Sequence, residues 1–64
     1  MRIEITVHAL DRWVKRHGGT VEELQRLLDT LPESKVRANN GHMMRFKGVS
    51  MVIKDGLLIT VGPK

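Results

Sequence analysis

The sequence predicts an α+β protein in which two N-terminal helices pack on an antiparallel sheet. Apolar residues recur at helical spacing over residues 7–31, and turn dipeptides separate short β-rich runs over residues 35–62. A short alternating stretch precedes both. With 64 residues, 41% of them hydrophobic, and no cysteine, we expect one domain over residues 1–64 without disulfide staples. The predicted architecture is a short N-terminal strand and two helices packed on a three- to four-stranded antiparallel meander sheet.

The first predicted elements are a strand over residues 1–6 and a helix over residues 7–17. Ile3 and Ile5 alternate with polar residues, which is the period of a strand. The spacing of Val7, Leu10, Val14 and His17 then indicates the apolar face of a helix, which Ala9 and Trp13 widen. We expect Thr6 to cap its N-terminus and the following glycine pair to end it.

A second helix is predicted over residues 20–31. Thr20 followed by Glu23 has the form of a capping box, in which each side chain bonds the other residue's backbone N–H. Leucines follow at helical spacing, and Pro32 disfavours helical geometry in the residue before it.

Residues 35–62 are predicted to be antiparallel strands, beginning with a short one at 35–38. Lys47-Gly48 and Asp55-Gly56 are expected to be two-residue hairpin loops, because glycine and aspartate accept the positive φ that such turns need. Regular pairing then places Met51 opposite Thr60 on the face that the helices cover. The other face is predicted to mix basic and apolar side chains, namely Met43, Arg45, Ser50, Val52, Lys54, Leu57, Ile59 and Val61.

The charge of the chain points to a polyanionic partner, with nucleic acid first. The formal net charge is +4, the pI is about 10.1, and no acid lies between Lys35 and Lys54. The alternative is a solvated basic edge that discourages aggregation between strands. We expect RNA or phosphate contacts from Lys15, Lys35, Arg37, Arg45 and Lys47. An aromatic content of 3% argues against a base-stacking platform.

The first helix carries the residues with the clearest catalytic pattern. His8, Arg12 and Arg16 follow one another at i, i+4 and i+8, which places them along one side of the helix. A histidine exchanges protons near neutral pH, and guanidinium groups neutralise charge that develops on a phosphate. Because the 2′-hydroxyl of RNA supplies the nucleophile, such a trio requires no metal. The alternative is that this side is simply the solvated face of an amphipathic helix.

The sequence also resembles a family at both ends. The motif Thr6-x-His8-Ala9-Leu10-x-Arg12-x-x-x-Arg16 is similar to the first helix of a small family of uncharacterised bacterial and phage proteins. The run from Lys54 to Val61 resembles that family's last hairpin. The family is grouped with the barnase, EndoU, colicin and RelE class of metal-independent ribonucleases. The resemblance implies that His8 is the acid–base residue, that Arg12 and Arg16 stabilise phosphate, and that Thr60 places a hydroxyl near the cleaved bond.

The sequence indicates neither a metal nor another cofactor. Its three histidines are scattered without carboxylates at ligand spacing, and there is no phosphate loop or dinucleotide-binding motif. His17 is expected at the end of its helix or at the edge of the core, whereas the role of His42 in its turn stays open. No apolar run approaches the roughly 20 residues of a membrane span, and we expect a cytoplasmic protein.

Three functions are consistent with these features. The first is a toxin-like, metal-independent endoribonuclease, which an acidic antitoxin would cover. The second is a non-enzymatic protein, for instance one encoded by a phage, that binds and inhibits a host protein or a nucleic-acid-processing complex. Its partner-binding surface would comprise Val52, Lys54, Leu57, Ile59 and Val61. The third is a plain nucleic-acid binder, whose affinity would fall steeply with salt. A homodimer through the half-apolar face is a further way to stabilise so short a chain.

Overall fold

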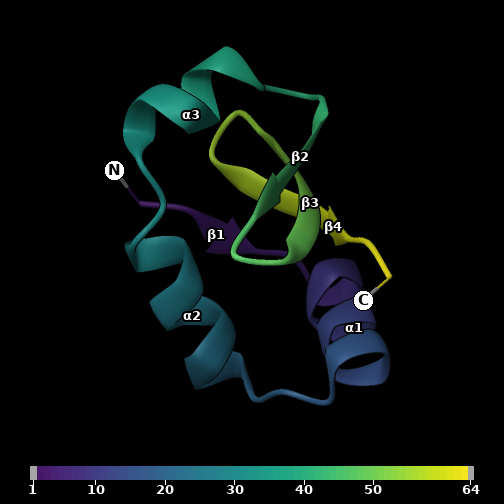
Figure 1. Cartoon of the computed structure of the whole chain (residues 1–64). Helices are drawn as coiled ribbons and strands as arrows, with labels where there is room; N and C mark the ends of the chain where they lie inside the picture. Colours follow the sequence, from purple (N-terminus) through teal and green to yellow (C-terminus); the bar gives the residue numbers. More distant parts are fainter. Residues whose placement is uncertain (1, 64) are drawn as a thin grey trace.

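The computed structural model describes residues 2–63, which form three helices and a four-stranded sheet (Figure 1). The sheet has the spatial order β1-β4-β3-β2, and the α+β prediction is confirmed. The elements in chain order are β1 (Glu4–Ile5), α1 (Val7–His17), α2 (Val21–Asp29), α3 (Glu33–Ala38), β2 (Met43–Phe46), β3 (Val49–Lys54) and β4 (Leu57–Val61).

The sheet is mixed, so the prediction of a fully antiparallel meander is wrong. β2, β3 and β4 are joined by hairpins and run antiparallel, whereas β1 pairs with β4 in parallel. The strand predicted over residues 1–6 is limited to Glu4–Ile5 within the described residues, and Met1 lies outside them. β1 is short because Thr6 turns the chain into α1 immediately after it.

Residues 35–38 belong to a helix, which corrects the strand predicted there. Pro32 occupies the N-cap of α3, where its missing N–H costs nothing. Arg37 forms an ion pair with Glu33 one turn earlier at 2.9 Å, and Val36 is buried. α2 also ends earlier than predicted, at Asp29, with Thr30 as its C-cap. Its capping box of Thr20 and Glu23 is confirmed.

Both predicted hairpin turns are present. Lys47 and Gly48 have φ values of 48° and 79°, and Asp55 and Gly56 have 50° and 79°. Two consecutive residues with positive φ give a turn whose twist matches that of the flanking strands. Phe46 therefore pairs with Val49, and Lys54 pairs with Leu57.

A β-bulge in β4 changes the predicted faces beyond the second hairpin. Ile53 pairs with Leu58 but Val52 pairs with Thr60, so one extra residue, Ile59, is inserted. The insertion reverses the alternation that follows it. Val61, predicted on the open face, is fully buried opposite Met51. Thr60, predicted beneath the helices, is half-buried opposite Val52 on the open face.

The core lies between the three helices and one face of the sheet. Side chains from the helices, the inner sheet face and the adjoining Ile3 and Leu31 form one cluster: Ile3, Ala9, Trp13, Leu24, Leu28, Leu31, Val36, Met44, Val49, Met51, Ile53, Leu58 and Val61. The buried residues of α1 are Ala9 and Trp13, whereas Val7 and Val14 are 86% and 50% exposed. The core is therefore contacted by the Ala9 and Trp13 side of the predicted apolar face, whereas its Val7 and Val14 side is exposed.

Candidate functional site

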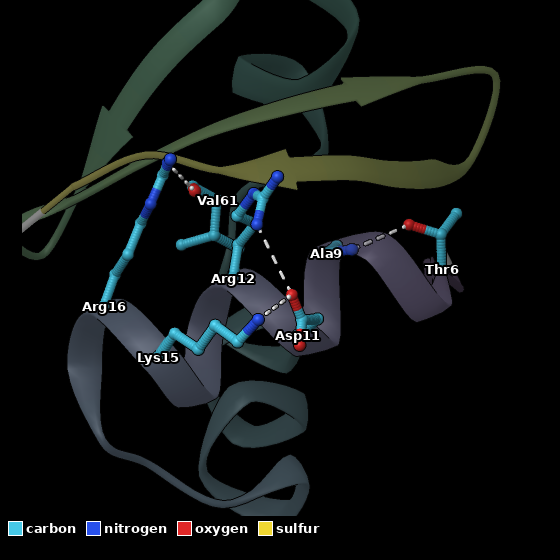
Figure 2. Close-up of polar contacts among 7 residues, drawn as sticks. All are labelled: Thr6, Ala9, Asp11, Arg12, Lys15, Arg16 and Val61. Carbon is cyan, nitrogen blue, oxygen red and sulfur yellow. Dashed lines mark hydrogen bonds and ion pairs between the residues drawn. The ribbon is translucent and has the colours of Figure 1, made fainter.

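The α1 flank is the part of the structure that holds the predicted catalytic residues of the first helix. We define it as His8, Arg12, Lys15 and Arg16, which follow one side of α1 next to its buried stripe. Arg12 and Arg16 both extend from α1 toward β4 (Figure 2). The flank thus borders the sheet and is not the fully solvated back of the helix.

Arg16 is fixed to the end of β4. Its Nη1 donates a hydrogen bond to the carbonyl oxygen of Val61 at 2.9 Å (Figure 2). A guanidinium has five N–H donors, so this bond leaves others for a ligand. The bond also orients the group and reduces the side-chain entropy that a ligand would otherwise have to overcome.

Arg12 and Lys15 are both attached to Asp11. Arg12 Nη1 lies 3.4 Å and Lys15 Nζ 3.2 Å from the same carboxylate oxygen of Asp11 (Figure 2). Solvent-accessible ion pairs of this kind contribute little to stability, about 0.2–1 kcal/mol, although Arg12 and Asp11 are themselves half-buried. Asp11 neutralises part of the charge of the flank, because one carboxylate faces two cations.

His8 lies in the first turn of α1 and is exposed. Among residues 2–63, no hydrogen bond or ion pair joins His8 to Arg12 or Arg16. The three residues share a flank because of their spacing, and the structure does not assemble them into a closed pocket. The imidazole is therefore open to a ligand that approaches from solvent.

His17 is a structural residue. Its ring stacks on the Trp13 indole with centroids 4.8 Å apart, and its Nε2 lies 3.1 Å from the carbonyl oxygen of Gly62. Trp13 Nε1 in turn donates to the Thr20 carbonyl at 2.8 Å. A Cβ at Gly19 would come within 2.7 Å of the indole, so the glycine turn is also the space in which Trp13 lies.

The other predicted basic residues gather around β2 and α3. Lys35 Nζ and Lys47 Nζ lie 5.8 Å and 5.4 Å from the centre of the Phe46 ring, within the range of cation–π attraction. Lys47 Nζ also approaches the Thr30 hydroxyl at 3.4 Å. Arg37 is exposed on α3, and Arg45 is exposed on the open sheet face opposite Ser50. The predicted phosphate-binding residues thus fall into two groups, one on α1 and one here.

The open sheet face retains four of the five predicted partner-binding residues. Leu57 and Ile59 are 39% and 38% exposed, Val52 is half-buried and Lys54 is exposed. Val61 is the exception, because the bulge turns its side chain into the core. Met43, at 57% exposed, lies on the same face at the far end of the sheet, as its strand position predicted.

Two further features of the structure concern metal binding and pockets. No cluster of three or more His, Asp or Glu side chains suited to a metal occurs within residues 2–63. A shallow hollow of about 390 Å³ lies on α2, lined by Val21, Glu22, Gln25 and Arg26, and none of the predicted site residues borders it.

Among the helices of residues 2–63, none combines the length and the apolar character that a membrane span requires.

Comparisons with known proteins identified no relative of this chain. No protein-family model matches the chain, and no curated protein or solved structure matches it either.

Proposed function

We propose that the protein is a small, metal-independent endoribonuclease that binds RNA along the α1 flank. The observation that carries the proposal is the placement of an exposed imidazole one turn from Arg12 and two turns from Arg16 on a helix that borders β4. Phosphodiester cleavage by the substrate's own 2′-hydroxyl needs a proton acceptor and a neutralised phosphate, and these residue types provide both.

Each residue then has a distinct role. His8 takes the proton from the 2′-hydroxyl as the oxygen attacks phosphorus and the bond to the 5′-oxygen breaks. The leaving 5′-oxygen takes a proton from water, and the products are a 2′,3′-cyclic phosphate and a 5′-hydroxyl. Arg16, oriented by the Val61 carbonyl, stabilises the charge that develops on the phosphate. Arg12 and Lys15 bind neighbouring phosphates once RNA competes with Asp11 for them. Thr60 lies on the open face of the sheet because of the bulge, so its hydroxyl contacts only the part of the substrate that extends from the α1 flank past β4.

The test is incubation of the purified protein with mixed RNA in the presence of EDTA. The proposal predicts a defined cut with a 2′,3′-cyclic phosphate end. His8→Gln is expected to reduce cleavage at least about a hundredfold, because general acid–base catalysis contributes about 10²–10⁴ in rate. His42→Gln, which changes an exposed histidine outside the flank, serves as the matched control. Intact RNA, or equal cleavage by His8→Gln, would contradict the proposal.

The open sheet face favours a second candidate function, inhibition of a nucleic-acid-processing complex without catalysis. Leu57 and Ile59 expose apolar area beside Lys54, a composition suited to a protein interface. Inhibition of transcription or nuclease activity in a purified assay would then be lost with Leu57→Asp and Lys54→Glu, and unaffected by His8→Gln. Inhibition that follows His8 instead would rule this candidate out.

A further inference from the structure

The outer edge of β2 is unpaired. β2 is the last strand of the sheet and pairs with β3 alone. A two-residue loop makes its flanking pair, Phe46 and Val49, exchange both hydrogen bonds. Along β2 the hydrogen-bonded positions are then Phe46 and Met44, whereas the backbone N–H and C=O of Arg45 and Met43 point away from β3. We call these four backbone groups the β2 edge.

Nothing within residues 2–63 satisfies the β2 edge. No turn, cap or side-chain hydrogen bond involves the backbone of Met43 or Arg45, and both residues are exposed. An open strand edge is a template for an added strand, because its N–H and C=O groups are already spaced for a ladder.

The positive charges around the β2 edge favour a partner strand that carries acidic side chains. Arg45 lies on the open face beside the edge, and Lys35 and Lys47 lie on the other face around Phe46. A second copy of β2 would place Arg45 close to its equivalent, and like charges across a strand pair are destabilising. A strand with acidic side chains meets a cation on either face.

We propose that the β2 edge binds an extended acidic segment of a partner protein by β-strand addition. Backbone hydrogen bonds to Met43 and Arg45 supply the pairing, and Lys35, Arg45 and Lys47 supply the preference for Glu or Asp. The same basic residues that keep β2 from pairing with itself thereby attract this partner. The proposal is independent of RNA cleavage, because it uses no residue of the α1 flank.

The probe is the labelled peptide acetyl-(Glu-Val)₃-amide, and the readout is fluorescence anisotropy with the wild-type chain. The proposal predicts saturable binding and no binding of the matched Lys-Val peptide. N-methylation of the two central peptide residues should weaken binding at least about fivefold, because it blocks the ladder on both edges of the peptide. This change is made in the peptide, so it cannot unfold the protein.

Two variants of the protein complete the test. Met43→Pro removes one outward N–H without a change of charge, and Arg45→Glu reverses one charge. Each is expected to weaken binding about fivefold or more while the protein stays folded, with a melting temperature lowered by no more than about 8 °C. Failure of the acidic peptide to bind, equal binding of the N-methylated peptide, or equal binding by Met43→Pro would overturn the proposal. An RNA bound here in place of a strand would also be insensitive to Met43→Pro.

Discussion

The two edges of the sheet differ in whether their unpaired backbone groups find hydrogen-bond partners. Where β1 ends, Thr6 Oγ1 donates to the Leu58 carbonyl at 2.6 Å, and Arg16 and His17 reach the carbonyls of Val61 and Gly62. α1 therefore closes the exposed side of β4 with side chains. At β2 the corresponding groups remain open. Arg16 and Arg45 are both basic residues beside a strand, yet one completes the fold and the other is available to a partner.

Among the variants that compare the two edges of the sheet, Trp13→Ala is expected to lower the free energy of unfolding most. The buried indole holds α1 against the sheet, and the loss of a buried aromatic side chain costs about 3–5 kcal/mol. That is comparable to the total stability of about 3–10 kcal/mol expected for a domain of this size. Val14→Ala, on the exposed side of the same helix, should change it by less than about 0.5 kcal/mol. Urea denaturation followed by far-UV circular dichroism measures both; equal losses would mean that Trp13 does not anchor α1.

Proline substitutions at neighbouring positions of β2 compare the edge that bonds to β3 with the edge that is open. Met44→Pro removes a buried side chain and an N–H that faces β3, and should cost about 3 kcal/mol or more. Met43→Pro removes an N–H that faces solvent and should cost less than about 1 kcal/mol, because edge strands accept proline there. The same denaturation measurement compares them. If Met43→Pro were as damaging as Met44→Pro, the assignment of the open edge would be wrong.

Thr6→Val tests the closure at the start of α1. The hydroxyl accepts from Ala9 N–H at 3.2 Å and donates to Leu58, so its removal should cost about 1–2 kcal/mol. Thr30→Val removes a hydroxyl that donates to the Leu27 carbonyl and accepts from Lys47 Nζ. Because both bonds are exposed to water, its removal should cost less than about 0.5 kcal/mol. Shifts of the urea midpoint report both, and a smaller shift for Thr6→Val than for Thr30→Val would contradict the role given to Thr6.

Arg16→Met and Arg12→Met give the smallest expected difference. Methionine keeps the apolar stem and removes the guanidinium. Arg16→Met loses the bond to Val61 and should cost about 1 kcal/mol, whereas Arg12→Met loses a half-exposed ion pair with a separation of 3.4 Å, worth about 0.5 kcal/mol or less. A thermal melt at low and high salt distinguishes them, because salt screens the ion pair more than the bond to a carbonyl.

The sequence predicted the features that depend on neighbouring residues. The caps at Thr6 and Thr20 and the turns at Lys47-Gly48 and Asp55-Gly56 follow from local backbone chemistry, and all are present. α3 was missed because it buries only Val36 and gives no periodic apolar signal; Pro32 followed by Glu33 and Arg37 one turn apart was the available clue.

The features that depend on distant residues were not predictable in the same way. Leu57-Leu58-Ile59-Thr60-Val61 is uniformly β-prone, so nothing local marks where an extra residue enters. The bulge is favoured by packing, since it lets both Leu58 and Val61 face the core. The parallel pairing of β1 with β4 and the bond from Arg16 to Val61 join the two ends of the chain. The residues of the α1 flank thus remain a prediction from the sequence, and the bond that attaches Arg16 to β4 is seen only in the structure.

Amide hydrogen exchange of β2, resolved by residue, tests the difference between the two edges most directly. We predict slow exchange at Met44 and Phe46, whose N–H groups bond to β3, and exchange close to that of an unfolded chain at Met43 and Arg45. Protection of Arg45 as strong as that of Met44 would contradict the account, because it would show that the β2 edge is already paired or covered.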